Sequence, residues 1–465
     1  MAEVLTELAS GENSRIFFDK HYFYRLLPRS QADFFLDLLH KLTPHVKAKV
    51  VGAKPLEHDV GIDKNADQAI LAHEKIRFIS YPHEWCASML KDAALFQLKL
   101  QQELLVDGLF LKDAHPWNIL FANGEFKFVD LPSIITQQTI ASFNQMMKSM
   151  FIPYFIMPLL GYAYGKRHWA KKRLEVTTLN AATDVITMRD CLPARKMSMK
   201  RLGDAVKLVK KTSQAKHLLS RQQGDIQGSL HSLQQLVESI DVNLGNSDYK
   251  NYYSQKGELN PHVYHDSWNA KQKNVYHAIS DENIHTVLDM ACNTGWYSIM
   301  AHKMGKNVVA VDYDEACIEE LYNQVKENGY SILPIWSSFT DLTSDRYSVS
   351  SGKRVLINFA ERIKCDAVIA LGFVHHLALG MGLTFADIVE KLSACTTHKL
   401  IVEFVELNDE MIVKHADFFP AFHQNNQQAE NYNLEAFIKA AMAHFTKFEV
   451  LSSYPVTRKI VVFKR

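Results

Sequence analysis

Acidic and small residues follow one apolar stretch in the order Val287-Leu288-Asp289-Met290-Ala291-Cys292-Asn293-Thr294-Gly295. We expect the apolar part to form a strand and the residues after Gly295 to form a helix. In a doubly wound sheet, ligands bind outside the carboxyl ends of the strands, at this kind of turn. Asp312 ends the next apolar stretch, 23 residues after Asp289, where a carboxylate can accept hydrogen bonds from both ribose hydroxyls. The spacing therefore predicts a nucleoside-binding site.

The pattern of glycines indicates which cofactor would fit. A dinucleotide site requires G-x-G-x-x-G, so that a pyrophosphate can approach the backbone at the start of the helix. Positions 291, 293 and 295 hold Ala, Asn and Gly, and no pyrophosphate cradle is evident. S-adenosylmethionine (SAM) carries no phosphate. It needs an acid for its amino end, space beside the turn and an acid for its ribose, and Asp289, Gly295 and Asp312 fit these needs.

Strands and helices alternate regularly from about residue 285 to residue 465. Strands are expected at 285–290, 307–312, 331–337, 366–371, 399–405, 448–453 and 459–464. Helices are expected at 296–304, 315–328, 384–394 and 434–445. This alternation indicates right-handed crossovers and a doubly wound, Rossmann-like α/β fold with seven strands. The last two strands, joined by a short turn, would be antiparallel.

The run D-M-A-C-N-T-G at 289–295 resembles motif I of the class I SAM-dependent methyltransferases. It is more similar still to the subfamily that includes host-specific nodulation proteins, which reads D-x-G-A-N-T-G. Further similar pieces follow in order: AVDYD at 310–314, the pair Glu361-Arg362, DAVIALGFVHHL at 366–377 and IVEFVELND at 401–409. The resemblance implies a methyltransferase domain that binds SAM and transfers its methyl group.

Two positions depart from the pattern of the subfamily. Ala291 replaces the first glycine of the motif and adds a methyl group where backbone and ligand approach closely. Ser338 stands near the place where the family usually has an acid that contacts the adenine amino group, and Asp341 is the candidate substitute. The residues expected to bind SAM or to shape its site are Asp289, Ala291, Asn293, Thr294, Gly295, Asp312 and Asp341.

Candidate catalytic groups follow the fourth and fifth expected strands. Methyl transfer from a sulfonium is an in-line displacement, so the protein mainly aligns the acceptor and, for a protonated acceptor, supplies a base. His375 or His376 is a candidate for that base, and the alternative is that the pair packs beside the cofactor or caps the next helix. Glu403 and Glu406 could face the acceptor or solvent. Aromatic residues that could form a lid over SAM, or simply pack, are Tyr249, Tyr252, Tyr253 and Trp268.

A second constellation lies in the run Leu111–Phe121 and the following Phe128-Val129-Asp130. Asp113, Asn118 and Asp130 have nearly the spacing of the kinase catalytic loop, in which one Asp positions a hydroxyl while an Asn and a second Asp hold Mg²⁺. However, no G-x-G-x-x-G loop or V-A-I-K strand precedes it, and Leu-Pro follows the second Asp. With SYPHEW at 80–85 and MLKDAAL at 89–95, the region also resembles the N-terminal part of the nodulation-type subfamily. An active phosphotransferase, a kinase-like remnant or substrate module, and a structural use of these residues in turns all stay open.

The texture of the chain suggests three parts. Residues 1–135 look like an α+β module with short strands at 49–52 and 76–80, and residues 136–245 like a helical connector rich in helix formers. Residues 246–465 form the expected methyltransferase domain. The apolar run 150–164 is shorter than the about 20 residues of a spanning helix and contains two prolines, so a buried helix pair or a docking surface is expected there and no transmembrane segment.

Composition restricts the classes of partner. The chain has 52 basic and 51 acidic side chains and a formal charge of +1, so no overall field would attract nucleic acid or an anionic membrane. The six cysteines are spread singly, without the spacing of a zinc site. No secretory signal is recognised at residues 1–13. We therefore expect a cytoplasmic protein without a bound metal.

The sequence thus predicts a SAM-dependent methyltransferase whose acceptor is not named. Residues 372–375 read Gly-Phe-Val-His where a methyltransferase acting on a planar amino group would carry an Asn-Pro-Pro-Tyr type motif. A small molecule, a lipid-linked saccharide and a protein all remain as acceptors. The alternatives are a bifunctional or kinase-like ATP-binding protein, and a non-catalytic scaffold that binds SAM.

Overall fold

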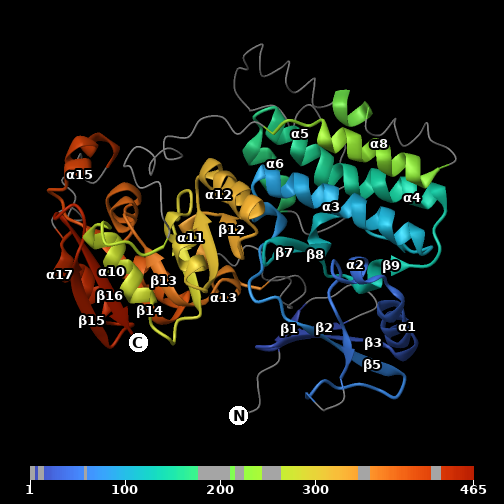
Figure 1. Cartoon of the computed structure of the whole chain (residues 1–465), viewed down its shortest axis with the longest axis horizontal. Helices are drawn as coiled ribbons and strands as arrows, with labels where there is room; N and C mark the ends of the chain where they lie inside the picture. Colours follow the sequence, from blue (N-terminus) through green and yellow to red (C-terminus); the bar gives the residue numbers. More distant parts are fainter. Residues whose placement is uncertain are drawn as a thin grey trace. The chain divides into compact units, whose positions relative to one another are not determined.

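The computed structural model describes residues 6–8, 15–56, 60–175, 210–214, 225–242, 263–343, 357–419 and 431–465. The chain divides into two compact units, with the main boundary between Gly245 and Asn246. Figure 1 shows the helices and strands of both units. The expected three-part division, with a separate helical connector at 136–245, stays a prediction.

The first unit begins with a five-stranded antiparallel sheet in the order β1-β2-β3-β5-β4. Its strands are β1 (Thr6–Leu8), β2 (Arg15–Phe18), β3 (Tyr22–Pro28), β4 (Lys54–Pro55) and β5 (Gln68–Glu74). Helix α1 (Arg29–Lys41) follows β3 and buries one apolar face, which includes Phe35 and Leu38. The short helix α2 (Pro44–Lys47) leads from α1 towards β4.

Two strands predicted from the sequence in this region, at 49–52 and 76–80, are absent from the structure, so these predictions were wrong. At 49–52 there is only an isolated bridge from Val50 to Phe128, and residues 76–80 form no strand. The pairing of β5 with β3 ends where the amide of Lys75 donates to the carbonyl of His21 at 3.0 Å. Because β3 begins at Tyr22, the residues after Lys75 have no further strand to pair with.

Helices form most of the rest of the first unit. They are α3 (Ala87–Val106), α4 (Ile140–Met146), the π-helix η4 (Met147–Ile156), α5 (Met157–Ala163), α6 (Arg167–Leu174) and α8 (Ile226–Glu238). Helix α3 packs against η4, α5 and α8. The apolar run 150–164 lies in η4 and α5 and is mostly buried, as the sequence indicated. No helix within the described residues is long and apolar enough to cross a membrane.

Two small sheets lie between α3 and α4. Strand β6 (Phe110–Leu111) pairs with β9 (Ile134–Ile135), and β7 (Ile119–Ala122) forms a hairpin with β8 (Glu125–Phe128). The 3-10 helix η2 (Pro116–Asn118) precedes β7, and η3 (Leu131–Ser133) follows β8. The loops that carry Asp113 and Asp130 therefore run between the same four short strands.

The second unit contains a mixed seven-stranded sheet in the order β12-β11-β10-β13-β14-β16-β15. Its strands are β10 (Thr286–Met290), β11 (Asn307–Asp312), β12 (Ile332–Trp336), β13 (Cys365–Ala370), β14 (Thr396–Val405), β15 (Lys447–Ser452) and β16 (Arg458–Lys464). The first five are parallel, and β16 runs antiparallel between β14 and β15. All seven strands lie where the sequence predicted them, with ends that differ by up to three residues. The chain order reverses between β10 and β13, and such a switch point is where ligands bind in doubly wound sheets.

Helices cover this sheet in two groups (Figure 1). Helices α11 (Trp296–Lys303) and α12 (Glu315–Asn328) connect the strands on one side of the switch point, and α10 (Ala270–Ile279) packs against α11. Helix α14 (Phe385–Ala394) packs against β14, the short α13 (Phe359–Arg362) and α17 (Leu434–Ala441). Because crossovers between parallel strands are right-handed in nearly all proteins, connections that run in opposite directions from β10 are expected to put the α11 and α14 groups on opposite faces of the sheet.

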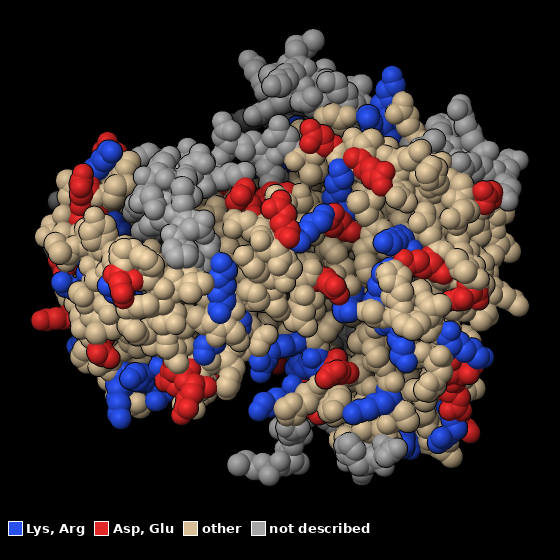
Figure 2. Space-filling view, viewed as in Figure 1, with Lys and Arg blue, Asp and Glu red and all other residues tan. Residues whose placement is uncertain are grey.

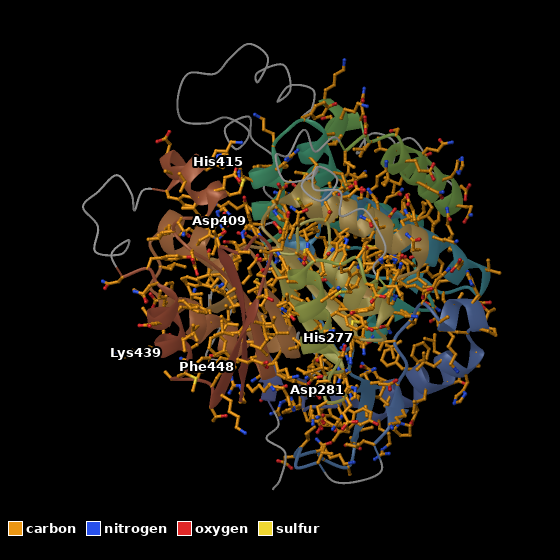
Figure 3. The ribbon with its side chains drawn as sticks, turned by 60° about the vertical axis from the view of Figure 1, so that its left-hand side comes forward. His277, Asp281, Asp409, His415, Lys439 and Phe448 are labelled. Atoms are coloured by element: carbon orange, nitrogen blue, oxygen red, sulfur yellow. The ribbon has the colours of Figure 1, made fainter. Side chains whose placement is uncertain are left out.

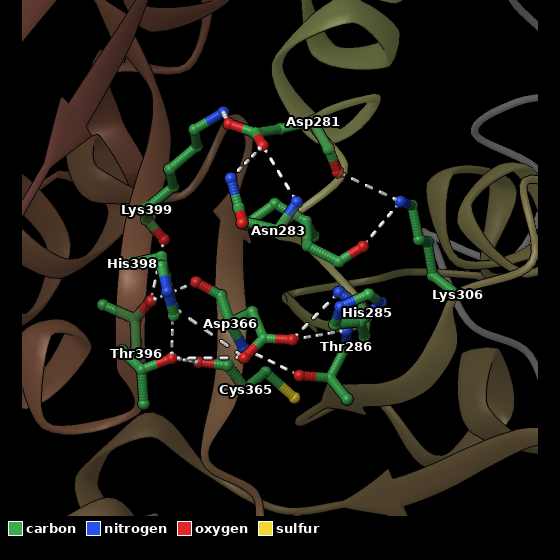
Figure 4. A network of polar contacts seen from close by, with 12 residues as sticks. Asp281, Asn283, His285, Thr286, Lys306, Cys365, Asp366, Thr396, His398 and Lys399 are labelled. Carbon is green, nitrogen blue, oxygen red and sulfur yellow. Dashed lines mark hydrogen bonds and ion pairs between the residues drawn. The ribbon is translucent and has the colours of Figure 1, made fainter.

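A polar network ties together the amino ends of the central strands (Figure 4). One carboxylate oxygen of Asp366 accepts the backbone amides of His285 and Thr286, both at 2.9 Å. Lys399 on β14 pairs with Asp281 at 2.6 Å. In Figure 3, Asp281 and Asp409 lie towards opposite ends of the second unit, because Asp281 precedes β10 and Asp409 follows β14. Hydrogen bonds and an ion pair thus stabilise the edge of the sheet formed by the amino ends of the strands. Ligands are expected at the opposite edge, beyond the carboxyl ends of the strands.

Candidate active site

The turn after β10 has an unusual backbone. Ala291, Asn293 and Gly295 have φ angles of 64°, 53° and 83°, in the left-handed region that costs a residue with a side chain about 1–2 kcal/mol. The amides of Ala291 and Cys292 both donate to the carbonyl of Val311 on the neighbouring strand. At Gly295 an added Cβ would overlap Leu321 of α12. The turn is therefore held tightly against β11 and α12, and Gly295 has no room for a side chain.

Asp289 is the buried acid on β10. Its Oδ2 accepts the hydroxyl of Ser298 on α11 at 2.6 Å. Burial raises the pKa of Asp289 to about 7, the repulsion of Asp312 adds to this increase, and Ser298 and the charge of Lys271 oppose it. A positive charge placed beside this carboxyl group would favour its ionised form and lower its pKa.

Asp312 ends β11 and lies within the electrostatic reach of Asp289. Its two oxygens accept the backbone amides of Asn293 and Asp314, each at 2.8 Å. Burial raises the pKa of Asp312 to about 6, although these amides favour the ionised form. The structure therefore places two buried acids beside one turn, and their roles in binding a cofactor stay predictions.

The remaining residues predicted to bind the cofactor lie along the same edge. The amide of Thr294 donates to the side-chain oxygen of Asn293 at 2.6 Å, which fixes the turn. Asp341 lies in the 3-10 helix η6 (Phe339–Thr343) after β12, and its Oδ2 is 3.4 Å from the amide of Ser338. The amide of Ser337 donates to the carbonyl of Asp312 at 3.0 Å, so the segment that leads to Asp341 starts beside that acid. A role of Asp341 towards adenine stays a prediction.

His375 and His376 follow β13 on this edge, and their ring centroids lie 4.1 Å apart. His375 is buried and His376 is exposed. Burial, with a contribution from His376 and Arg458, lowers the pKa of His375 well below its usual value. Its Nδ1 has no hydrogen-bond partner among the described residues. His375 is therefore neutral at pH 7, the state in which an imidazole can accept a proton.

Glu403 is buried, and both of its carboxylate oxygens are hydrogen-bonded. It is fully buried on β14, where its two oxygens accept Lys271 and the hydroxyl of Ser453, both at 2.8 Å. Glu406 is half-buried and follows β14. Asp409 binds Arg458 of β16 through two hydrogen bonds of 2.9 and 3.1 Å. Glu403 is thus buried and paired, and it does not face solvent.

Lys271 lies close to the candidate site but was not predicted from the sequence. Helix α10 places its Nζ against Glu403, 5.7 Å from the ring centre of Tyr297, and its charge favours the ionised form of Asp289. The capping box formed by Asn269 and Gln272 predicts the start of this helix, but not the direction of the lysine. Among the possible lid residues, Trp268 packs against the Trp296 ring at 5.3 Å. Tyr249, Tyr252 and Tyr253 lie outside the described residues.

Within the described parts of the chain, no three His, Cys, Asp or Glu side chains are grouped so that they could hold a metal ion. Lys, Arg, Asp and Glu are interspersed over the face drawn in Figure 2.

Fold and site together define an α/β protein with a candidate nucleoside site at the switch point of a mixed sheet. Over 391 residues the chain is 26% identical to nodulation protein NoeA of Rhizobium meliloti. This alignment covers 80% of this chain and 76% of NoeA. Over 61 residues the chain is 44% identical to ribosomal protein L11 methyltransferase of Thermotoga petrophila, covering 13% of this chain and 22% of that one. The resemblance to nodulation-type proteins is thus confirmed. No family model matches the chain.

Several solved structures are similar to part of the chain. A putative O-methyltransferase from Nostoc punctiforme is 14% identical with a TM-score of 0.29, and covers 42% of this chain and 55% of that one. The bifunctional kinase-methyltransferase WbdD is also 14% identical, with a TM-score of 0.30 and a coverage of 45% of each chain.

Proposed function

We propose that this protein is a SAM-dependent methyltransferase and that residues 246–465 form its Rossmann-like catalytic domain. One observation carries the proposal: the buried acids Asp289 and Asp312 flank a turn whose backbone adopts three positive φ angles at the switch point of the sheet. The 61-residue similarity to a methyltransferase supports it. The spread of single cysteines supports a cytoplasmic location.

The residues present fit SAM better than a dinucleotide. Ala291 and Asn293 put Cβ atoms where a pyrophosphate would need bare backbone, whereas SAM has no phosphate. We assign Asp312 to the ribose hydroxyls, Asp289 to the amino end and Asp341 to the adenine amino group. When bound, SAM supplies an electrophilic methyl group. Its positive charges would favour the ionised forms of two acids whose pKa values are otherwise raised.

On the acceptor side, we assign His375 as the group that takes up a proton. Its ring is neutral and buried, and its Nδ1 lacks a partner in the described part of the chain. General bases of this kind contribute about 10²–10⁴-fold to a rate. With an identified acceptor and saturating SAM, His375→Asn should therefore lower kcat by about that factor without changing the affinity for SAM. An unchanged kcat would leave His375 a packing role.

The acceptor can be found with methyl-labelled SAM and fractionated lysate. We expect the label to appear in one acceptor fraction while S-adenosylhomocysteine accumulates in proportion. The reaction mixture with Asp312→Asn, at a SAM concentration near the dissociation constant of the original chain, serves as the matched control and should show much less of both products. If SAM binds but no fraction takes up label and no S-adenosylhomocysteine forms, the protein is a non-catalytic scaffold and the proposal is wrong.

A further inference from the structure

The first unit contains a cluster of polar residues that methyl transfer does not use. Because β6 pairs with β9 and β7 pairs with β8, residues 112–118 and 129–133 run next to each other. The amide of Lys112 donates to the carbonyl of Ser133 at 2.8 Å, and the amide of Val129 donates to the carbonyl of Asn118 at 2.9 Å. Residues that are distant in sequence are therefore held together by backbone bonds.

Asp113 and Asp130 are joined through one serine in this cluster. The hydroxyl of Ser133 donates to Oδ2 of Asp113 at 3.2 Å, and its amide donates to the carbonyl of Asp130 at 2.9 Å. Both carboxylates lie close enough to His115 to favour its protonated form, against the burial that lowers its pKa. Gln97 of α3 also donates to the carbonyl of Asp113 at 3.2 Å. The two acids thus have fixed positions on one rigid support.

A basic residue reaches the cluster from the five-stranded sheet. Nη2 of Arg25 on β3 lies 3.2 Å from Oδ1 of Asp130, and its side chain is largely buried. His73 on the neighbouring strand β5 is kept uncharged, because burial and the charge of Arg25 lower its pKa to about 4. The sheet therefore presents one positive charge, without a second one beside it from His73, to the loops that carry the acids.

Asn118 gives an independent sign of a missing ligand: its Nδ2 can donate only to an acceptor such as a phosphate oxygen, while its Oδ1 is the atom that could bind a cation. Its side chain is only 9% exposed, and its Nδ2 has no hydrogen-bond partner among the described residues. The large majority of buried side-chain polar atoms in proteins have at least one hydrogen-bond partner. Asn118 also stands five residues after Asp113 and directly before the hairpin that leads to Asp130.

We propose that the first unit binds a nucleoside triphosphate with Mg²⁺, and that Asn118 and Asp130 hold the cation while Arg25 contacts the phosphates. Carboxylate and amide oxygens are suitable Mg²⁺ ligands, and such sites use one or two carboxylates together with the phosphates of the substrate. In protein kinases an Asp and an Asn hold Mg²⁺, and the basic residue lies on the third strand of the sheet, as Arg25 does here. Asp113 is placed to orient a hydroxyl group.

The proposed site offers few protein ligands to a metal ion. The described residues contain no group of three His, Cys, Asp or Glu side chains that could hold a metal. The phosphates must therefore complete the coordination. Mg²⁺ alone should bind weakly, and nucleotide and metal should each increase the affinity for the other, because coupling between two ligands is reciprocal.

Calorimetric titration of the full chain with ATP tests the proposal. With 5–10 mM Mg²⁺, an excess over the nucleotide, we expect a dissociation constant below about 1 mM, the upper end of usual KM values. Without Mg²⁺ the affinity should fall at least tenfold. Inorganic tripolyphosphate with Mg²⁺ is a second ligand, and equal affinity for it would show that no nucleoside is recognised and would overturn the proposal.

Three variants locate the site. Asp130→Asn and Asn118→Ala should each weaken ATP binding by about tenfold or more, as expected for the loss of a contact to a charged group. Glu125→Gln, a carboxylate on the same hairpin whose side chain is 75% exposed, should bind ATP like the original chain. Asn118→Ala removes a side chain whose Nδ2 has no hydrogen-bond partner among the described residues, and it leaves the Arg25–Asp130 pair intact. This variant therefore still tests the proposal if Asp130→Asn does not fold.

The result is independent of methyl transfer. Affinity for SAM, measured in the same preparations, should not change in the three variants. If none of the preparations binds ATP with Mg²⁺, or if Asn118→Ala and Glu125→Gln bind it equally, the first unit has no such site. Failure of SAM to bind would instead contradict only the proposed function.

Discussion

Ala291 occupies a backbone conformation that favours glycine. Its φ of 64° costs about 1–2 kcal/mol relative to a residue without a side chain. Ala291→Gly should therefore raise the free energy of unfolding of the second unit by about 1 kcal/mol, after the greater unfolded-state entropy of glycine is subtracted. Urea unfolding measures this change.

Gly295→Ala is the matched opposite case. It combines a φ of 83° with an overlap of the new Cβ and Leu321, so the free energy of unfolding should fall by more than about 1–2 kcal/mol. A stability of Ala291→Gly at or below that of the original chain would contradict the strain assigned to the turn.

The paired acids predict how SAM affinity depends on pH. In the folded protein without ligand the pKa values are about 7 for Asp289 and about 6 for Asp312, above about 4 in the unfolded chain. Binding of the positively charged cofactor favours both ionised forms and so releases protons below these values. Affinity should rise between pH 5 and 7 by up to about tenfold per pH unit for each proton released, and calorimetry in buffers of different ionisation enthalpy counts those protons.

The same acids give stability the opposite dependence on pH. Their raised pKa values mean that the folded state holds protons that the unfolded chain has lost. The free energy of unfolding without ligand should therefore decrease from pH 4 to 7, by up to about 1.4 kcal/mol per pH unit for each acid. Asp289→Asn removes its share of this slope. A slope unchanged in that variant would show that Asp289 is not the titrating group.

At the scale of elements, one ion pair fastens the last strand to the site edge. Asp409 begins α15 (Glu410–Lys414) and binds Arg458 of β16 and the hydroxyl of Thr457. Asp409→Ala would remove both hydrogen bonds between this carboxylate and the buried guanidinium of Arg458 and leave it only the longer ion pair to Glu403 at 3.9 Å. The free energy of unfolding should therefore fall by up to about 3–5 kcal/mol. The exposed neighbour Glu410→Ala should change it by less than about 0.5 kcal/mol. Similar losses in both variants would contradict the role of the pair.

The elements of the second unit could largely be predicted from the sequence. Strands β10, β11 and β12 are largely apolar runs, and Asp289 and Asp312 lie at or near the carboxyl ends of β10 and β11. The insertion of β16 between β14 and β15 could not be predicted, since it depends on long-range pairing. The contacts of Lys271 with Glu403 and Tyr297 also depend on tertiary packing. The false strand at 76–80 shows the same limit, because an apolar run becomes a strand only where a partner strand is available.

The sites proposed for SAM and for ATP lie in different units of the molecule. A ligand that binds only the folded state stabilises the unit that contains its site, by about 2.7 kcal/mol at a concentration of 100 times the dissociation constant. In differential scanning calorimetry, SAM should therefore raise the transition of the second unit. ATP with Mg²⁺ should raise the transition of the first. A shift of both transitions by either ligand alone would show that the units unfold together.

The most direct test of the central claim is a calorimetric titration of SAM into the full chain and into Asp312→Asn. Asp281→Asn, at the amino edge of the same sheet, is the control. We expect one SAM per chain to bind the original protein and the control, and Asp312→Asn to lose about 10-fold to 100-fold in affinity with its fold intact by circular dichroism. An original chain that does not bind SAM, or an Asp312→Asn variant that binds it equally well, would contradict the account.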